Sequence, residues 1–240
     1  MRECIRSTHL LLLPGMMCDE RLWRHQAAAL SGSYDISVGN MTRDESVEAI
    51  AQRILAEAPP SFALAGLSMG AIVAMEMWRQ QPQRIERLAL LDTNIGADAP
   101  ERRPIRDRQI AEVMSGGLEA VLRDELKPNY LAQCHRDNQA LLEEVLAMGV
   151  DMGQQIFVRQ SLALRDRADN RPVLATVNCP TLILCGDEDR LCPLELHSDM
   201  AKRIHGAVLR VIPQCGHLST MEQPEQVTHA LQHWLNPAEE

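Results

Sequence analysis

The ten residues FALAGLSMGA at positions 62–71 constrain the fold of this chain more than any other stretch. They begin as an apolar run that predicts a buried strand, and they lead into an apolar helical run over 71–78. Between the two, Gly66 to Gly70 match G-x-S-x-G, the tight strand-to-helix turn that holds a serine hydroxyl clear of the backbone. Glycines suit this turn because a Cβ at either position would collide with the neighbouring strand or helix. The stretch therefore predicts Ser68 as a nucleophile, with a glycine-rich turn around an inert serine as the alternative.

The rest of the chain supplies strands and helices in alternation. Apolar runs predict six strands, at 9–13, 34–38, from 62 to the serine turn, 87–91, 181–185 and 208–212. Helical patterns separate them, at 19–30, 44–58, 71–78, after Pro193 and at 224–235. Nearly continuous apolar strands with intervening helices predict an α/β fold, with a mostly parallel sheet and helices on both of its faces. In such a sheet the chemistry belongs at the carboxyl ends of the strands.

The segment 96–172 departs from this pattern. It is rich in charge, has no strand-like run, and divides into amphipathic helical pieces near 106–114, 118–126, 139–149 and 154–164. Its length is too great for a loop in a compact domain. We predict that 96–172 form a helical cap inserted after the fourth predicted strand, and that 1–95 and 173–240 form the core.

Composition limits the partners and the compartment. The net charge of -9 and the lack of a Lys/Arg-rich run argue against a nucleic-acid partner. The apolar run at 10–13 follows Arg2 and Arg6 but is too short for a signal peptide, and no stretch is long enough to span a membrane. The seven cysteines form an odd set without a C-x-x-C pair, which predicts reduced thiols in a cytoplasmic protein. The oligomeric state has no signal in the sequence.

Two polar loops follow the last two predicted strands. The residues GDEDRLCP at 186–193 place acids directly after one strand, and CGHL at 215–218 places His217 after the next. A buried carboxylate there could orient the histidine, and the histidine could activate the serine. The chain order serine, acid, histidine is that of α/β-hydrolases.

On these motifs, followed by Glu222-Gln223-Pro224, the chain resembles the α/β-hydrolase superfamily, in particular its small capped esterase and enol-lactonase-like members. The resemblance covers the core on both sides of the predicted cap and implies the α/β-hydrolase fold. The family frame G-x-x-D-x-x-x-P places the acid at Asp189, with Asp92 after the fourth strand as the alternative.

The resemblance also implies an oxyanion hole formed by two backbone N–H groups, those of Met69 and Met16. The second donor is inferred because Pro14-Gly15 stands where relatives often have His-Gly. Two further departures are Ala71, where many relatives have a second glycine, and the lack of the family's usual first two strands.

Three further side chains are candidates for the substrate pocket. Met17 lies near the proposed site, and methionine fills adaptable apolar pockets. Arg159 and Arg165 lie in the last predicted cap helix, where some relatives hold a substrate carboxylate, although nearby acids favour surface ion pairing. No metal or cofactor is predicted, because the spacing of Glu225, His229 and His233 on the last helix is better explained by a solvated helix face.

These observations predict a serine hydrolase that cleaves a small carboxylic ester, lactone or thioester through an acyl-enzyme on Ser68, with His217 as base and Asp189 as orienting acid. Alternatives on the same triad are C–C bond hydrolysis, disfavoured by Leu67 where such relatives often have Asn, and cofactor-free perhydrolase or acyltransferase chemistry. A non-catalytic ligand receptor of this fold is a further alternative, although such proteins commonly lack a triad member.

Overall fold

The computed structural model describes residues 9–236, so Arg2, Cys4 and Arg6 lie outside the described residues. The core is one six-stranded sheet in the order β2-β1-β3-β4-β5-β6, and every neighbouring pair of strands is parallel. The strands are β1 (His9–Leu13), β2 (Asp35–Val38), β3 (Phe62–Leu67), β4 (Ile85–Leu91), β5 (Thr181–Gly186) and β6 (Val208–Ile212). The predicted α/β class is therefore confirmed, with a sheet that is entirely parallel over this part of the chain.

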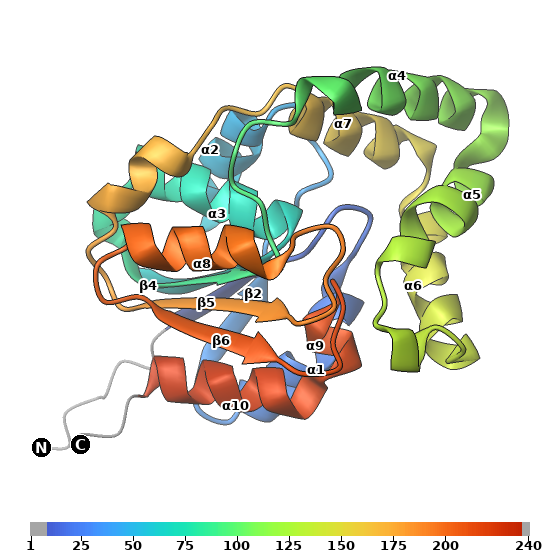
Figure 1. Cartoon of the computed structure of the whole chain (residues 1–240). Helices are drawn as coiled ribbons and strands as arrows, with labels where there is room; N and C mark the ends of the chain where they lie inside the picture. Colours follow the sequence, from blue (N-terminus) through green and yellow to red (C-terminus); the bar gives the residue numbers. More distant parts are fainter. Residues whose placement is uncertain (1–8, 237–240) are drawn as a thin grey trace, which may run out of the picture.

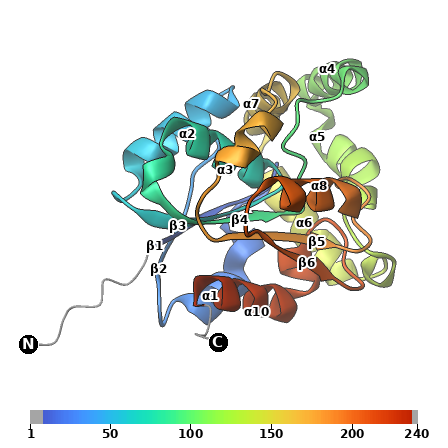
Figure 2. The same ribbon diagram turned by 60° about the vertical axis from the view of Figure 1, so that its left-hand side comes forward.

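Helices cover both faces of the sheet, as Figures 1 and 2 show. One face carries α2 (Val47–Glu57), α3 (Met69–Gln80) and α8 (Leu194–Arg203), and the other carries α1 (Arg24–Leu30) and α10 (Pro224–Leu235). Successive strand side chains alternate between the two cores: Leu11 and Leu13 pack toward α2 and α3, whereas Leu10 and Leu12 pack toward α1 and α10. Burial on both faces explains why the central strands β1, β3, β4 and β5 are mostly apolar, whereas the edge strands β2 and β6 are only partly buried and carry some polar residues.

The predicted element boundaries differ from the structure by a few residues. β4 begins at Ile85 rather than 87, because Ile85 pairs with Phe62 at the edge of β3 before the chain exposes Glu86. The helix predicted from 19 to 30 is a 3-10 turn (Glu20–Trp23), capped by the Asp19 side chain, followed by α1. Such shifts are expected where helix and strand ends fray.

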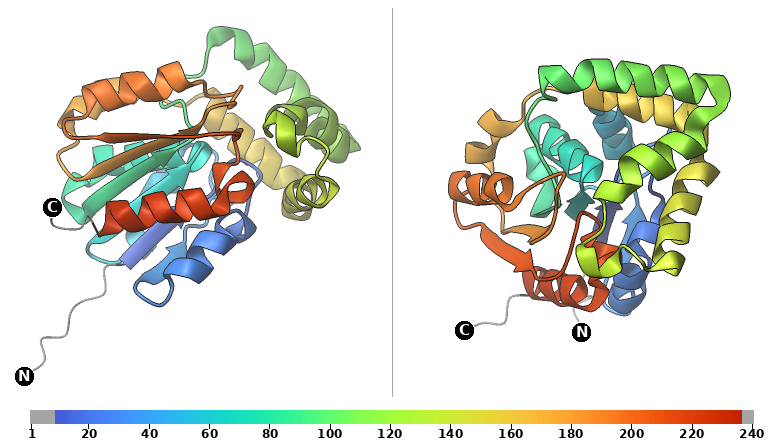
Figure 3. Two further views of the ribbon diagram at one scale, coloured as in Figure 1. Left: turned by 60° about the horizontal axis from the view of Figure 1, so that its bottom comes forward. Right: turned by 45° about the vertical axis from the view of Figure 1, so that its right-hand side comes forward.

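The segment 96–172 contains α4 (Arg103–Glu112), α5 (Leu118–Ala120), α6 (Gln139–Met152) and α7 (Gln154–Arg165). It lies beyond the carboxyl ends of β5 and β6 (Figure 1), and the left-hand view of Figure 3 shows its helices beside the ends of the strands. The segment 118–126 is helical as predicted, but α5 itself is short and continues as a π-helical turn (Val121–Leu126). A π-helical turn also follows α4, where Gly116 has φ 101°, a left-handed conformation that glycine adopts without strain.

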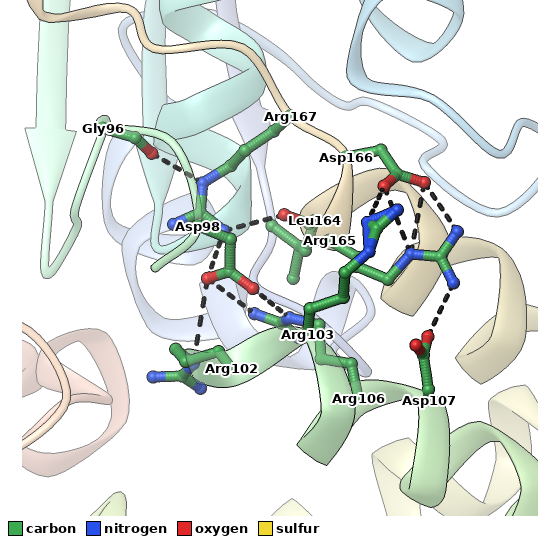
Figure 4. A network of polar contacts seen from close by, with 10 residues as sticks. All are labelled: Gly96, Asp98, Arg102, Arg103, Arg106, Asp107, Leu164, Arg165, Asp166 and Arg167. Atoms are coloured by element: carbon green, nitrogen blue, oxygen red, sulfur yellow. Dashed lines mark hydrogen bonds and ion pairs between the residues drawn. The ribbon is translucent and has the colours of Figure 1, made fainter. Parts of the chain in front are cut away.

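A network of ion pairs joins the two ends of this segment (Figure 4). The buried Asp98 carboxylate accepts from Arg106 Nε at 2.5 Å and from Arg167 Nη1 at 3.0 Å. Arg167 Nε also donates to the Gly96 carbonyl oxygen at 2.8 Å. Because Asp98 lies on the outgoing connection and Arg167 on the returning one, the two connections are fixed to each other.

No helix among the residues described, 9–236, is long and apolar enough to cross a membrane.

Candidate active site

The serine turn has the geometry that its glycines predict. Ser68 lies between β3 and α3 with φ 54°, one of the few positive values at a residue other than glycine. A Cβ at Gly66 would lie 2.4 Å from the carbonyl of Gly70, and a Cβ at Gly70 would lie 2.2 Å from the Leu13 oxygen. Only glycine fits at either position, so the strand and helix can approach closely enough to form the sharp turn.

The structure brings Ser68, His217 and Asp189 into one hydrogen-bonded series. His217 Nε2 lies 2.9 Å from Ser68 Oγ, and His217 Nδ1 lies 2.8 Å from Asp189 Oδ2. The three residues follow β3, β6 and β5 respectively, so the parallel sheet delivers them to the same edge. In a neutral imidazole, Nδ1–H donates to the carboxylate and Nε2 accepts the serine proton, which is the arrangement a general base requires.

Burial and the opposite charge of the partner shift the pKa values of Asp189 and His217 in opposite directions. Burial by itself raises the pKa of the Asp189 carboxyl, but His217 and the backbone N–H groups of Cys192 and Leu191 bring it below its ordinary value. Burial lowers the pKa of His217, but the Asp189 carboxylate more than compensates, so the histidine pKa lies above its ordinary value. The carboxylate therefore stays ionised and stabilises an imidazolium when one forms.

Asp92, the alternative acid, makes different contacts. Its buried side chain accepts from the Gly186 N–H at 3.1 Å and from the Ser219 hydroxyl at 2.5 Å. Burial, followed by the nearby Asp189 charge, raises the pKa of Asp92 well above its ordinary value. The structure thus pairs the histidine with Asp189, and Asp92 supports the backbone of the acid loop.

Asp187 and Glu188, the two acids that precede Asp189, hold neighbouring loops through hydrogen bonds from the backbone. Asp187 Oδ1 accepts from the Cys215 N–H at 3.2 Å, and Glu188 Oε2 accepts from the Gln133 N–H at 2.8 Å. Both therefore fix loops around His217 without contacting its ring.

The two predicted oxyanion donors lie on segments that flank Ser68. Met69 is the first residue of α3, where a backbone N–H has no acceptor within the helix. A Cβ built at Gly15 would lie 3.7 Å from the Ser68 Cβ, so the loop that carries Met16 passes beside the serine. The next N–H along that loop, of Met17, is already bound to Gln160 Oε1 at 2.8 Å.

The histidine loop is held by residues whose role the sequence did not predict. The His217 N–H donates to the Tyr130 carbonyl at 2.7 Å, and the two rings lie 5.7 Å apart. The buried Glu222 carboxylate accepts from the N–H groups of Ala132 at 2.7 Å, Gly216 at 3.0 Å and Leu218 at 3.2 Å. Glu222 was recognisable as part of the motif after the histidine, whereas no local signal points to Tyr130.

The predicted pocket side chains make no hydrogen bond to the series. Met17 is buried in an apolar cluster with Phe157, and Arg159 Nη1 donates to the Thr42 carbonyl at 3.2 Å. Arg165 lies 2.7 Å from both Asp107 and Asp166, as Figure 4 shows. Surface ion pairing, which the sequence favoured, describes Arg165 in the structure.

Asp189, Cys192 and His217 offer ligand atoms within 4.8 Å of one another, a spacing that could hold a metal ion. His217 Nδ1 and Asp189 Oδ2 are bound to each other, however, and burial raises the pKa of the Cys192 thiol well above its ordinary value. A cysteine binds a metal ion as its thiolate. The three side chains therefore fit a hydrogen-bonded His217–Asp189 pair beside a neutral thiol better than a metal site. His229 and His233, considered above, are exposed on α10.

Comparisons with known proteins agree with the observed fold. A sequence profile of the alpha/beta hydrolase family matches residues 10–230. A Serratia proteamaculans protein, provisionally named the carbamate hydrolase RutD, is 27% identical over 172 residues, which cover 71% of this chain and 64% of that protein. A protein of the same name from Shigella flexneri is 25% identical over 236 residues, covering 90% of this chain and 86% of that protein.

Solved structures have the same architecture. A thermophilic esterase from Thermogutta terrifontis, with malate bound, is similar with a TM-score of 0.87 and 28% identity, over 95% of this chain and 89% of that one. The enol-lactonase from Burkholderia xenovorans LB400 has a TM-score of 0.87 at 20% identity, over 96% of this chain and 92% of that one. At that identity the second likeness shows the fold alone.

Proposed function

The chain belongs to the alpha/beta hydrolase family and is a hydrolase, and from this premise we propose that it cleaves a small carboxylic ester, lactone or thioester through an acyl-enzyme on Ser68. The observation that carries the proposal is the series Ser68–His217–Asp189, with contacts of 2.9 and 2.8 Å. The similarity to an esterase at 28% identity supports an ester as the substrate class.

In the proposed reaction His217 takes the Ser68 proton as Oγ attacks the acyl carbon. Asp189 holds the imidazole in the required tautomer and stabilises the imidazolium. The N–H groups of Met16 and Met69 hold the oxyanion, and each such donor typically contributes about 3 kcal/mol of transition-state stabilisation. The protonated leaving group departs, and a water activated by His217 releases the acid.

A matched set of substrates tests the proposal. p-Nitrophenyl acetate and butyrate should be hydrolysed, with loss of more than about 10³-fold in kcat for Ser68→Ala. Ser115→Ala is the matched control and should leave kcat unchanged, because within the described part of the chain that exposed hydroxyl bonds only the Glu112 carbonyl. Esterase activity that survives Ser68→Ala would exclude every mechanism with this serine as nucleophile.

The same assay separates the reaction classes. An ester, a lactone, a thioester and a carbamate of equal acyl size should be compared, the last because two relatives carry a carbamate hydrolase name. Hydrogen peroxide or an alcohol as acyl acceptor tests perhydrolase or acyltransferase chemistry, and a dienoic diketone tests C–C bond hydrolysis. We expect the oxygen ester to have the highest kcat/KM.

We also propose that the segment 96–172 acts as a cap over the site and that the protein works in a reducing, cytoplasm-like compartment. The contact of Tyr130 with His217 supports the cap. The free thiols of the six cysteines in the described part of the chain support the reducing compartment.

A further inference from the structure

A cavity lies in the segment 96–172, and none of the residues that line it belongs to the Ser68–His217–Asp189 series. It has a volume of about 550 Å³ and opens between α6 and the turn before Tyr130. Its walls are Arg123, Lys127, Leu131, Arg136, Gln139, Leu142, Glu143 and Leu146. Figures 1 and 3 show α5 and α6 on the side of the molecule that faces away from the sheet. The volume lies in the range of pockets that bind small molecules.

The walls carry an excess of positive charge, although the whole chain has a net charge of -9. Arg123 forms an ion pair with Glu119, and the single acid of the wall, Glu143, is exposed at the rim. Lys127 and Arg136 have no carboxylate within ion-pair distance among the residues that the structure describes. Two cations therefore remain for a ligand to neutralise.

Lys127 is almost fully buried, with 5% of its surface exposed. Its Nζ donates to the Val145 carbonyl and lies 5.5 Å from the centre of the Tyr130 ring. Burial lowers the pKa of Lys127 to about 8, so the side chain is still mostly charged at neutral pH. One carbonyl does not satisfy an ammonium group with three donors.

Arg136 also has donors without a hydrogen-bond acceptor. Its Nε and Nη2 atoms are buried and have no hydrogen-bond partner within the described chain. A buried charged donor without an acceptor is unfavourable, so a small rotation of the guanidinium toward an anion in the cavity would be favoured. Nε and one Nη form the fork that binds a carboxylate through two parallel hydrogen bonds.

Apolar side chains complete the cavity. Leu131, Leu142 and Leu146 line it beside the two cations. We propose that this cavity binds a small amphipathic carboxylate, with the carboxylate on Arg136 and Lys127 and the aliphatic part against the three leucines. Inorganic phosphate fits the wall less well, because it offers nothing to contact the leucines.

Binding measurements test this inference without reference to turnover. Octanoate should bind the full-length protein. Octanol, which lacks the charge, and inorganic phosphate, which lacks the alkyl group, should each bind at least about tenfold more weakly. Arg136→Gln and Lys127→Met should each weaken octanoate binding by about tenfold or more. Arg203→Gln is the control, because that exposed arginine on α8 forms an ion pair with Asp199 at the surface and does not line the cavity.

Octanoate could also occupy the serine site as a product-like acid, and the variants distinguish the two locations. Ser68→Ala should leave octanoate binding unchanged, and Leu142→Trp, which fills the cavity, should abolish it. If Lys127→Met does not fold, the Arg136 and Leu142 variants still decide the question. Octanoate affinity that is unaffected by Arg136→Gln and Leu142→Trp, or equal affinity for octanol, would overturn the proposal.

Discussion

Replacing Glu222 by glutamine should reduce both stability and activity, although Glu222 does not contact Ser68. Glu222 is 5% exposed, and its carboxylate binds three backbone N–H groups, two in the His217 loop and one, of Ala132, in the segment 96–172. Glutamine is nearly isosteric but has one oxygen in place of two. Its amide N–H must then face a backbone N–H, so at least one buried donor loses its acceptor.

The magnitude follows from these contacts. A hydrogen bond to a charged acceptor contributes about 1.5–3 kcal/mol, and an unsatisfied buried donor costs a similar amount. Glu222→Gln retains one oxygen, so we expect a loss of about 2–3 kcal/mol in the free energy of unfolding. Misplacement of a catalytic group by about 1 Å can cost about 100-fold, so a smaller shift of His217 should lower kcat about tenfold.

Urea unfolding and the pH profile of kcat/KM measure the two effects. The Glu222 charge is one of the groups that raise the pKa of His217, after Asp189 and Asp92. Its removal should therefore move the acid limb of kcat/KM to lower pH, which a purely structural defect would not do. Glu225→Gln, on the exposed face of α10, is the matched control and should change neither quantity. A Glu222→Gln enzyme with wild-type kcat and an unchanged acid limb would refute this reasoning.

Three other changes have defined outcomes. Asp189→Asn should lower kcat by about 10³–10⁴-fold, and the acid limb of kcat/KM should move to lower pH because Asp189 no longer raises the pKa of His217; an unchanged limb would assign the acid elsewhere. Gly66→Ala should destabilise the fold by about 3 kcal/mol in urea unfolding, because its Cβ would lie 2.4 Å from backbone atoms, whereas Gly32→Ala, with open space around it, should not. Burial raises the pKa of Asp98, but its arginine partners outweigh burial, so the pKa in the folded protein lies below the ordinary 3.8. The Asp98 carboxylate therefore stabilises the fold above pH 3.8, and this contribution is lost as the pH falls through the folded pKa. Asp98→Asn should thus cost about 3 kcal/mol at pH 7, and the difference in stability from wild type should shrink as the pH falls below the ordinary pKa of the carboxyl.

The sequence predicted the parts of the site that local chemistry defines. The turn at Ser68 was recognisable because two glycines are needed where strand and helix backbones meet. His217 and Asp189 were recognisable because polar residues directly follow apolar strands, and parallel strands end at one edge. The central strands were predicted because burial on both faces leaves a nearly continuous apolar pattern, whereas the edge strands β2 and β6 are only partly buried.

Contacts between distant segments could not be predicted in this way. Tyr130 meets His217 through a backbone carbonyl, a group that every residue carries, so no residue type marks the contact. The contacts of Glu222 could not be predicted for the same reason, because its carboxylate oxygens accept from backbone N–H groups rather than from a particular side chain. The π-helical turns beside Gly116 depend on how α4 and α5 pack, whereas the periodicity of the sequence indicates regular helices.

Apart from the turn at Ser68, the strained backbone at this edge of the sheet could not be predicted, and it bears on how the site is maintained. Met17, Ser68, Asp92 and Gln214 have φ between 46° and 54°, and each follows a strand within a few residues. These conformations are unfavourable outside glycine, so the surrounding contacts must impose them. Gln160 holds the Met17 N–H, and Asp92 binds through its side chain to the acid loop and to Ser219. Because Gln160 belongs to α7 in the segment 96–172, the loop that carries the proposed oxyanion donor depends on that segment for its shape. Gln160→Leu should therefore lower kcat while leaving the Ser68–His217 contact intact, and an unchanged kcat would show that the loop keeps its conformation by itself.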